Sequence, residues 1–184
     1  MKKTDVDGRI TIFRGTPQDV GIKYATINKT EILNRNNLWL TDCFKHGFRE
    51  TDLIDRSAQY VAVAQEITPW LLEEAKAIAG VLEVPSTLFI SSVALQKLTA
   101  NMDVLSSDDE CTSIIAVGNA TKNGESILHK NRDNNIGVQS VYEKEIIYKG
   151  KALNRFIGTS YVYDFGTNAF INDKGIAGAV NAGE

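Results

Sequence analysis

The sequence predicts an α+β fold in which a helical segment precedes a domain built from strands. Before residue 106, apolar residues recur at helical spacing. After residue 111, short runs of β-branched and aromatic residues alternate with turn residues. A polar, acidic stretch at residues 106–110 separates the two regimes and predicts an exposed linker. We therefore expect a helical segment at residues 1–110 and a strand-rich domain at residues 111–184.

Four helices are expected in the first part of the chain. Residues 18–34 and 52–66 each carry apolar residues at helical spacing. The clearest helix begins at Thr68–Pro69, because threonine can cap a helix and proline suits its first turn. It ends at Val84–Pro85, and a fourth helix is expected over residues 86–98. We interpret Gly15 and Gly21 as glycines that the backbone needs, not as ligand contacts.

Strands follow one another after residue 111. Asn123–Gly124 predicts a hairpin turn, and residues 173–175 predict another tight turn. We interpret the charges at residues 143–145 as a solvated strand face. The expected strands are 112–118, 126–130, 138–150, 156–163, 168–172 and 175–181. Because the chain stops directly after the last of these, we expect the strand-rich domain to be truncated.

Composition excludes several classes of function. The net charge is −3 with both signs spread along the chain, so no basic surface for nucleic acid or polybasic membrane attachment is expected. The first residues have no apolar segment behind their lysines, which excludes a signal peptide. Charges interrupt every apolar stretch before 18 residues, so no membrane span is expected. These observations predict a soluble, cytoplasmic protein.

The chain has two cysteines, Cys43 and Cys111. No CxxC pattern occurs, and His46 and His129 do not lie at ligand spacing, so no metal site is expected. Without an export signal, both cysteines are expected to be free thiols. We interpret Cys43 as structural, because nothing around it indicates chemistry.

Cys111 directly follows the acidic linker and precedes a predicted strand. A thiol becomes a nucleophile only after it loses its proton to a base. One such base is the nucleophile's own α-amine, whose pKa of about 7.7–8.0 suits proton transfer near neutral pH. Residue 111 has a free α-amine only if the chain is cut before it, and the linker is where a cut is expected.

Residues 110–135, ECTSIIAVGNATKNGESILHKNRDNN, resemble the active-site segment of the penicillin acyltransferase family of N-terminal-nucleophile hydrolases. Cholylglycine hydrolases and acid ceramidase are its more distant relatives. The resemblance rests on Cys111-Thr112, the Asn123–Gly124 turn and the Asn131-Arg132-Asp133 element. Residues 13–25, 68–90 and 170–183 resemble the opening motif, the helical pair before cleavage and the last hairpin of that family.

The resemblance implies a self-processing cysteine amidohydrolase or acyltransferase. Cys111 would cut the Glu110–Cys111 bond and then attack the amide or acyl donor of a small-molecule substrate. Asp133 matches the carboxylate that holds the freed amine, Asn181 matches an oxyanion-hole position, and Asn131 would orient the loop. The resemblance further implies an αββα sandwich, no metal or organic cofactor, and a prosegment (1–110) that stays bound as an α chain. Whether the protein forms oligomers is left open.

Other interpretations stay open at this point. Glu110 stands where the penicillin acyltransferase has glycine, and Lys130 stands where cholylglycine hydrolases have arginine, which argues against a bile-salt substrate. Asp133 and Asn181 also suit turns. The chain could be a non-catalytic, uncleaved precursor or a fragment of such a protein. A third hypothesis pairs Cys111 with His129 in a conventional Cys–His peptidase.

Overall fold

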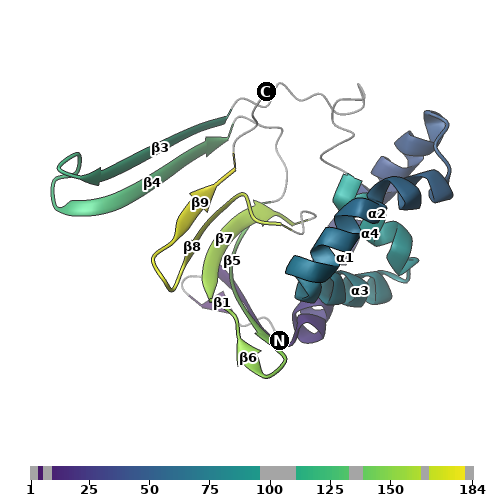
Figure 1. The fold of residues 1–184 in the computed structure, drawn as a ribbon, viewed down its shortest axis with the longest axis horizontal. Helices are drawn as coiled ribbons and strands as arrows, with labels where there is room; N and C mark the ends of the chain where they lie inside the picture. Colours follow the sequence, from purple (N-terminus) through teal and green to yellow (C-terminus); the bar gives the residue numbers. More distant parts are fainter. Residues whose placement is uncertain (1–3, 6–9, 96–110, 133–138, 163–165, 181–184) are drawn as a thin grey trace.

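The computed structural model describes residues 4–5, 10–95, 111–132, 139–162 and 166–180, which form a mixed α+β fold (Figure 1). The helices are α1 (Pro17–Lys45), α2 (Glu50–Ile67), α3 (Pro69–Leu82) and α4 (Ser86–Leu95). The strands are β1 (Thr4–Asp5), β2 (Ile10–Gly15), β3 (Cys111–Gly118), β4 (Gly124–Arg132), β5 (Gln139–Tyr148), β6 (Lys151–Ala152), β7 (Phe156–Tyr161), β8 (Ala169–Asn172) and β9 (Ala177–Ala179).

Local sequence explains how α1 begins. Thr16 caps the helix, and its side chain and that of Asp19 exchange hydrogen bonds with each other's backbone N–H groups. The Thr16 hydroxyl also donates to the Asp19 carboxylate, and this bond, followed by the one from the Thr16 backbone N–H, lowers the pKa of the Asp19 carboxyl. The helix is longer than the expected 18–34 and is interrupted at Asn28, whose side chain donates to the carbonyl of Tyr24.

The other helix predictions are confirmed in position, with differences in detail. Thr68 does precede α3 with Pro69 in its first turn, but the Thr68 side chain makes no capping hydrogen bond. Of the apolar residues at helical spacing on α2, Leu53 is buried, whereas Ala58 and Ala62 are exposed. No single helix among the described residues is long and apolar enough to cross a membrane; only the bent pair α3 and α4 meets that test together, by length and composition.

The main sheet has the strand order β1-β2-β5-β7-β8-β9, with β6 paired to the end of β5. Strand β2 pairs with β5 in parallel, from Ile10 opposite Val141 to Gly15 opposite Ile146, and the other neighbours are antiparallel. Neither β1 nor β2 is among the strands expected from the sequence. The chain before the linker therefore contributes two strands to the sheet that residues after the linker form.

The helices cover one face of this sheet (Figure 1). The largest buried cluster lies between the helices and the sheet. Phe13 of β2 packs against Tyr24 of α1 and Tyr142 of β5. Ile78 of α3 lies in the same cluster and is 1% exposed. We call this contact between α1, α3, β2 and β5 the helix–sheet joint.

A close crossing of α1 and α3 supports the joint. A Cβ atom at Gly21 would lie 2.5 Å from the backbone oxygen of Glu74, so only glycine allows this approach. Gly15 has a φ of +141°, which also favours glycine. Both observations fit the interpretation of these glycines as backbone requirements.

Strands β3 and β4 form a separate two-stranded hairpin that extends beyond the edge of the main sheet (Figure 1). Gly118 and Gly124 adopt positive φ angles on either side of the connecting turn. The predicted turn at residues 173–175 is also present. Gly175 has a φ of +78°, and the Asn172 side chain accepts hydrogen bonds from the backbone of Lys174 and Ile176.

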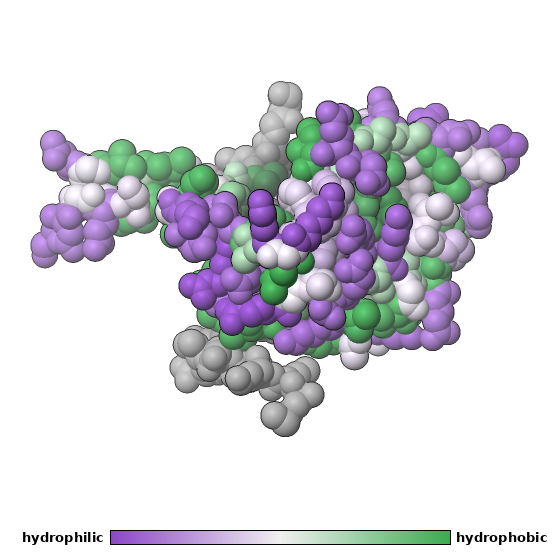
Figure 2. All heavy atoms as spheres, turned by 60° about the horizontal axis from the view of Figure 1, so that its bottom comes forward, coloured by the Kyte–Doolittle hydropathy of each residue, from purple (hydrophilic) through white to green (hydrophobic). Residues whose placement is uncertain are grey.

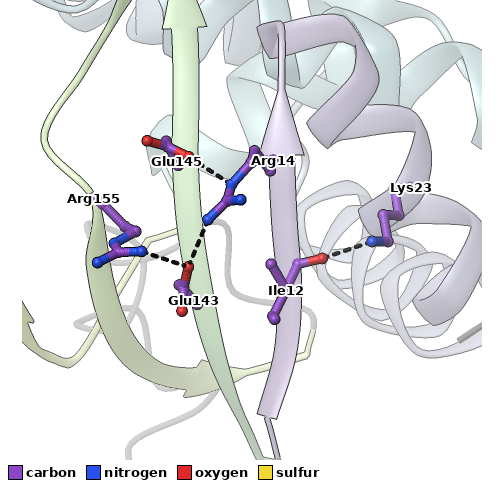
Figure 3. A network of polar contacts seen from close by, with 6 residues as sticks. All are labelled: Ile12, Arg14, Lys23, Glu143, Glu145 and Arg155. Carbon is purple, nitrogen blue, oxygen red and sulfur yellow. Dashed lines mark hydrogen bonds and ion pairs between the residues drawn. The ribbon is translucent and has the colours of Figure 1, made fainter. Parts of the chain in front are cut away.

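The interpretation of residues 143–145 as a solvated strand face is wrong for Lys144. Strand alternation directs the Lys144 side chain toward the helices, where Lys144 is buried. Glu143 and Glu145 lie on the opposite face, half-buried, and form ion pairs with Arg14 of β2 (Figure 3). Arg155 approaches Glu143 from the other side. The charges are paired across neighbouring strands, which the local sequence did not reveal.

Candidate active site

Cys111 is the first residue of β3, directly after the acidic linker. The hairpin register pairs Cys111 with Arg132 and Thr112 with Asn131. The predicted nucleophile and the first residue of the Asn131–Asp133 element therefore lie at the same, open end of the hairpin. A register shift occurs between Ala116 and Gly118, close to the turn and far from Cys111.

Asn131 is exposed on β4, opposite an exposed Thr112. The predicted role of Asn131 in orienting the loop stays a prediction. Glu110, Asp133 and Asn181 lie outside the described residues, so their predicted roles stay predictions.

His129 is exposed and pairs with Ile114, three residues along the strand from Cys111. At about 3.3 Å per residue, this spacing places the two backbone positions roughly 10 Å apart along the hairpin. A nucleophile and its base need to approach to hydrogen-bonding distance. The register therefore gives no support to a Cys–His pair formed by these residues.

Cys43 differs from a reactive thiol in its surroundings. Its side chain is buried in a second cluster with Trp39, Leu53, Leu88 and Leu95. Burial, followed by the nearby Asp42 carboxylate, raises the pKa of the Cys43 thiol. A buried thiol with a raised pKa stays protonated at neutral pH, which fits the structural role expected from the sequence.

The hairpin that begins with Cys111 exposes large apolar side chains. In Figure 2 it forms the arm that projects from the body of the molecule, with apolar residues along it. Ile115 is 73% exposed and Ile114 is 58% exposed, although these neighbours on one strand point to opposite faces. Val117 and Ile127 are also more than half exposed. Strands that are apolar on both faces are typical of sheets covered on both sides.

Sequence reasoning missed one buried ion pair. Lys144 of β5 donates to Glu74 Oε1 of α3 at 2.6 Å, and both side chains are almost fully buried. Burial raises the pKa of Glu74, and the Lys144 ammonium opposes this shift. A signal for the pair exists in the sequence. Glu74 lies one helical turn from both Trp70 and Ile78, and Lys144 alternates with Tyr142 and Ile146.

Within the part of the chain that the structure describes, no group of three or more His, Cys, Asp or Glu side chains could hold a metal ion. A scan of protein-family models finds no match to this chain, and a search of curated proteins finds no similar sequence.

Proposed function

We propose that this protein is a self-processing cysteine amidohydrolase or acyltransferase with Cys111 as its nucleophile. The observation that carries the proposal is the place of Cys111: it directly follows the acidic linker and begins a strand whose register partner is Arg132. A cut before Cys111 would thus create a new N-terminus at the end of a paired strand. The backbone pairing with Arg132 would help to hold this new N-terminus in place.

The proposed chemistry has two stages. In the first, Cys111 Sγ attacks the carbonyl carbon of Glu110, the peptide C–N bond breaks, and a thioester forms while the Cys111 amine is released. Water then hydrolyses the thioester and leaves a free carboxylate on Glu110. In the second stage the freed amine accepts the thiol proton, Sγ attacks a substrate amide or acyl donor, and the leaving group departs with a proton. Water or an amine finally takes the acyl group from Cys111.

The remaining roles in the proposal come from the resemblance to the penicillin acyltransferase family. Asp133 would hold the Cys111 amine, Asn131 would orient the loop, and Asn181 would donate to the oxyanion, a contribution of about 10²–10³ in rate for one donor. The substrate class is a linear amide or acyl donor of small size. No metal or organic cofactor is needed for these steps.

We also propose that the fold is part of an αββα sandwich. Helices cover one face of the main sheet, and the opposite face carries half-exposed Val141, Ile157 and Ile171. Because such apolar residues on a sheet face usually pack against another layer, they support a second sheet over this face. The apolar faces of the β3–β4 hairpin support its inclusion in that second sheet.

Thiol labelling and an amide panel test the proposed nucleophile. Wild-type protein and the Cys111→Ala and Cys43→Ala variants are treated with a thiol-directed electrophile under native conditions and assayed for amide hydrolysis. We expect Cys111→Ala to abolish both labelling and turnover, while Cys43→Ala keeps both, because Cys43 is buried. Equal behaviour of wild type and Cys111→Ala would refute the proposal and favour the non-catalytic precursor or fragment. Loss of labelling in His129→Ala without any chain cleavage would favour the Cys–His peptidase.

A further inference from the structure

The buried ion pair joins the two parts of the chain that the linker connects. Glu74 belongs to α3, before the linker, and Lys144 belongs to β5, after it. The Glu74 side chain is 0% exposed and the Lys144 side chain is 6% exposed, with Nζ and Oε1 2.6 Å apart. The pair therefore lies inside the helix–sheet joint, where most of the buried side chains are apolar.

Such a pair is a poor source of stability. Removing a carboxylate and an ammonium from water costs several kcal/mol per ion, and their attraction offsets this only when every polar atom is satisfied. Glu74 Oε2 is buried and has no hydrogen-bond partner in the described structure. The ion pair that Lys29 forms with Glu83 also joins α1 to α3 but lies at the surface, where this cost does not arise. The buried pair thus calls for a role other than net stabilisation.

Apolar contacts in the joint do not by themselves select one position of α3 along β5, because the hydrophobic effect is non-directional. Trp70 of α3 packs on Tyr148 of β5 with ring centroids 5.7 Å apart, and Ile78 packs in the same cluster. The crossing at Gly21 constrains α3 relative to α1, but against β5 alone a helix displaced by one turn, about 5.4 Å, could bury similar apolar residues. The same displacement would separate the Glu74 carboxylate from the Lys144 ammonium and leave Glu74 as an uncompensated buried charge, which is strongly unfavourable.

We propose that the Glu74–Lys144 pair selects the position of α3 on β5, so that the helical part and the sheet stay associated in one arrangement even when the linker is cut. Strand β2 supplies a second tie, because it pairs with β5 along six residues. On the face away from the helices, Arg14 of β2 also binds Glu143 and Glu145 (Figure 3). The inference holds whether or not the chain cuts itself before Cys111.

The test uses the whole chain with residues 106–110 replaced by the recognition sequence of a site-specific protease. All variants carry Trp39→Phe, which leaves Trp70 as the single indole, since the chain has two tryptophans. After cutting, a dilution series on a size-exclusion column measures the dissociation constant of the two pieces. Trp70 emission reports the contact with Tyr148. We compare the reference protein with Glu74→Gln, Lys144→Met, the double variant Glu74→Leu/Lys144→Met, and the surface control Lys29→Met.

The reference pieces are expected to stay together after the cut. Each single substitution at the pair should weaken their association by about 10²-fold or more, because it breaks a buried ion pair by removing one of its two members. Lys29→Met should change the association less than about fivefold. The double variant should recover tight association but show a shifted or heterogeneous Trp70 emission, because paired charges then no longer favour one position of α3 on β5.

Three results would overturn the proposal. The first is release of the pieces from the reference protein, and the second is single variants at the pair that behave like Lys29→Met. The third is a double variant that keeps the reference Trp70 emission, or that fails to fold, because either shows that the pair does not select among positions that apolar packing would also allow. Self-cleavage plays no part in this experiment, so its outcome is independent of the proposed catalytic function.

Discussion

The helix–sheet joint and the β3–β4 hairpin differ in how much they bury their apolar side chains. In the joint, Val20, Ala79 and Ile78 are at most 1% exposed. On the hairpin, Ile115 is 73% exposed and Ile127 is 51% exposed. Both regions contain large aliphatic side chains, so residue type alone does not decide their burial.

The two regions have different roles in the molecule. The joint is held by its own contacts. Apolar side chains of α1, α3, β2 and β5 pack together, and β2 pairs with β5, although these elements lie on both sides of the linker in the sequence. The hairpin carries the proposed nucleophile at its first residue and leaves its apolar side chains open to a covering layer. Substitutions in the joint should therefore affect folding strongly, and substitutions on the hairpin should leave folding almost unchanged.

The largest stability effect is expected in the joint. Replacing Ile78 by alanine leaves a cavity at a side chain that is 1% exposed, so the free energy of unfolding should fall by about 2–5 kcal/mol. Urea unfolding followed by circular dichroism measures this change. A loss below about 1 kcal/mol would show that the joint is less tightly packed than described.

A smaller loss is expected from added bulk at the helix crossing. The Cβ of Gly21→Ala would meet the backbone oxygen of Glu74 at 2.5 Å, so α1 and α3 must separate, at a cost of about 1–3 kcal/mol. Gly80→Ala on α3 is the matched control, because no atom lies within 4 Å of its added Cβ. The control should gain up to about 1 kcal/mol from the higher helix propensity of alanine. Equal effects at the two glycines would contradict the close crossing.

The pH dependence of stability tests the burial of Glu74. Its pKa is raised above the usual value of 4.5, so the folded chain binds this proton more tightly than the unfolded chain does. Stability from this group therefore rises as pH falls through the raised pKa toward 4.5, and declines as pH increases. Glu74→Gln should remove this component from the plot of unfolding free energy against pH, whereas Glu73→Gln on the same helix should keep it. Parallel plots for wild type and Glu74→Gln would contradict the burial.

The smallest effect is expected on the hairpin. Ile115→Thr keeps a β-branched residue at an exposed strand position, so the free energy of unfolding should change by less than about 0.5 kcal/mol. The same urea assay checks it beside Ile78→Ala. A loss comparable to that of Ile78→Ala would mean that the hairpin is covered in solution, by a second copy of the chain or by another protein.

Local signals in the sequence predicted much of the fold. Pro69 and Ser86 marked helix starts, and Asn123–Gly124 and Asp173–Gly175 marked turns, because capping and turn chemistry act over a few residues. Strand β2 was missed because its partner is distant: Arg14 and Glu143 are 129 residues apart. Lys144 was placed in solvent for the same reason, since only the packing of α3 reveals its partner.

The candidate site was predicted from motif resemblance and only partly from physical pattern. The strand that begins at Cys111 agrees with the strand expected at residues 112–118, whereas the role of Asn131 stays a prediction. The approach of Asp133 or Asn181 to Cys111 depends on tertiary contacts that residue spacing does not determine. The sequence therefore identifies the proposed nucleophile better than the groups that would assist it.

Intact mass spectrometry of the purified chain, with N-terminal sequencing of each product, tests the central claim most directly. The account predicts two polypeptides, the second beginning at Cys111, and a single uncut polypeptide for Cys111→Ala. A wild-type chain that remains whole under native conditions, or a cut that persists in Cys111→Ala, would contradict self-processing by this thiol.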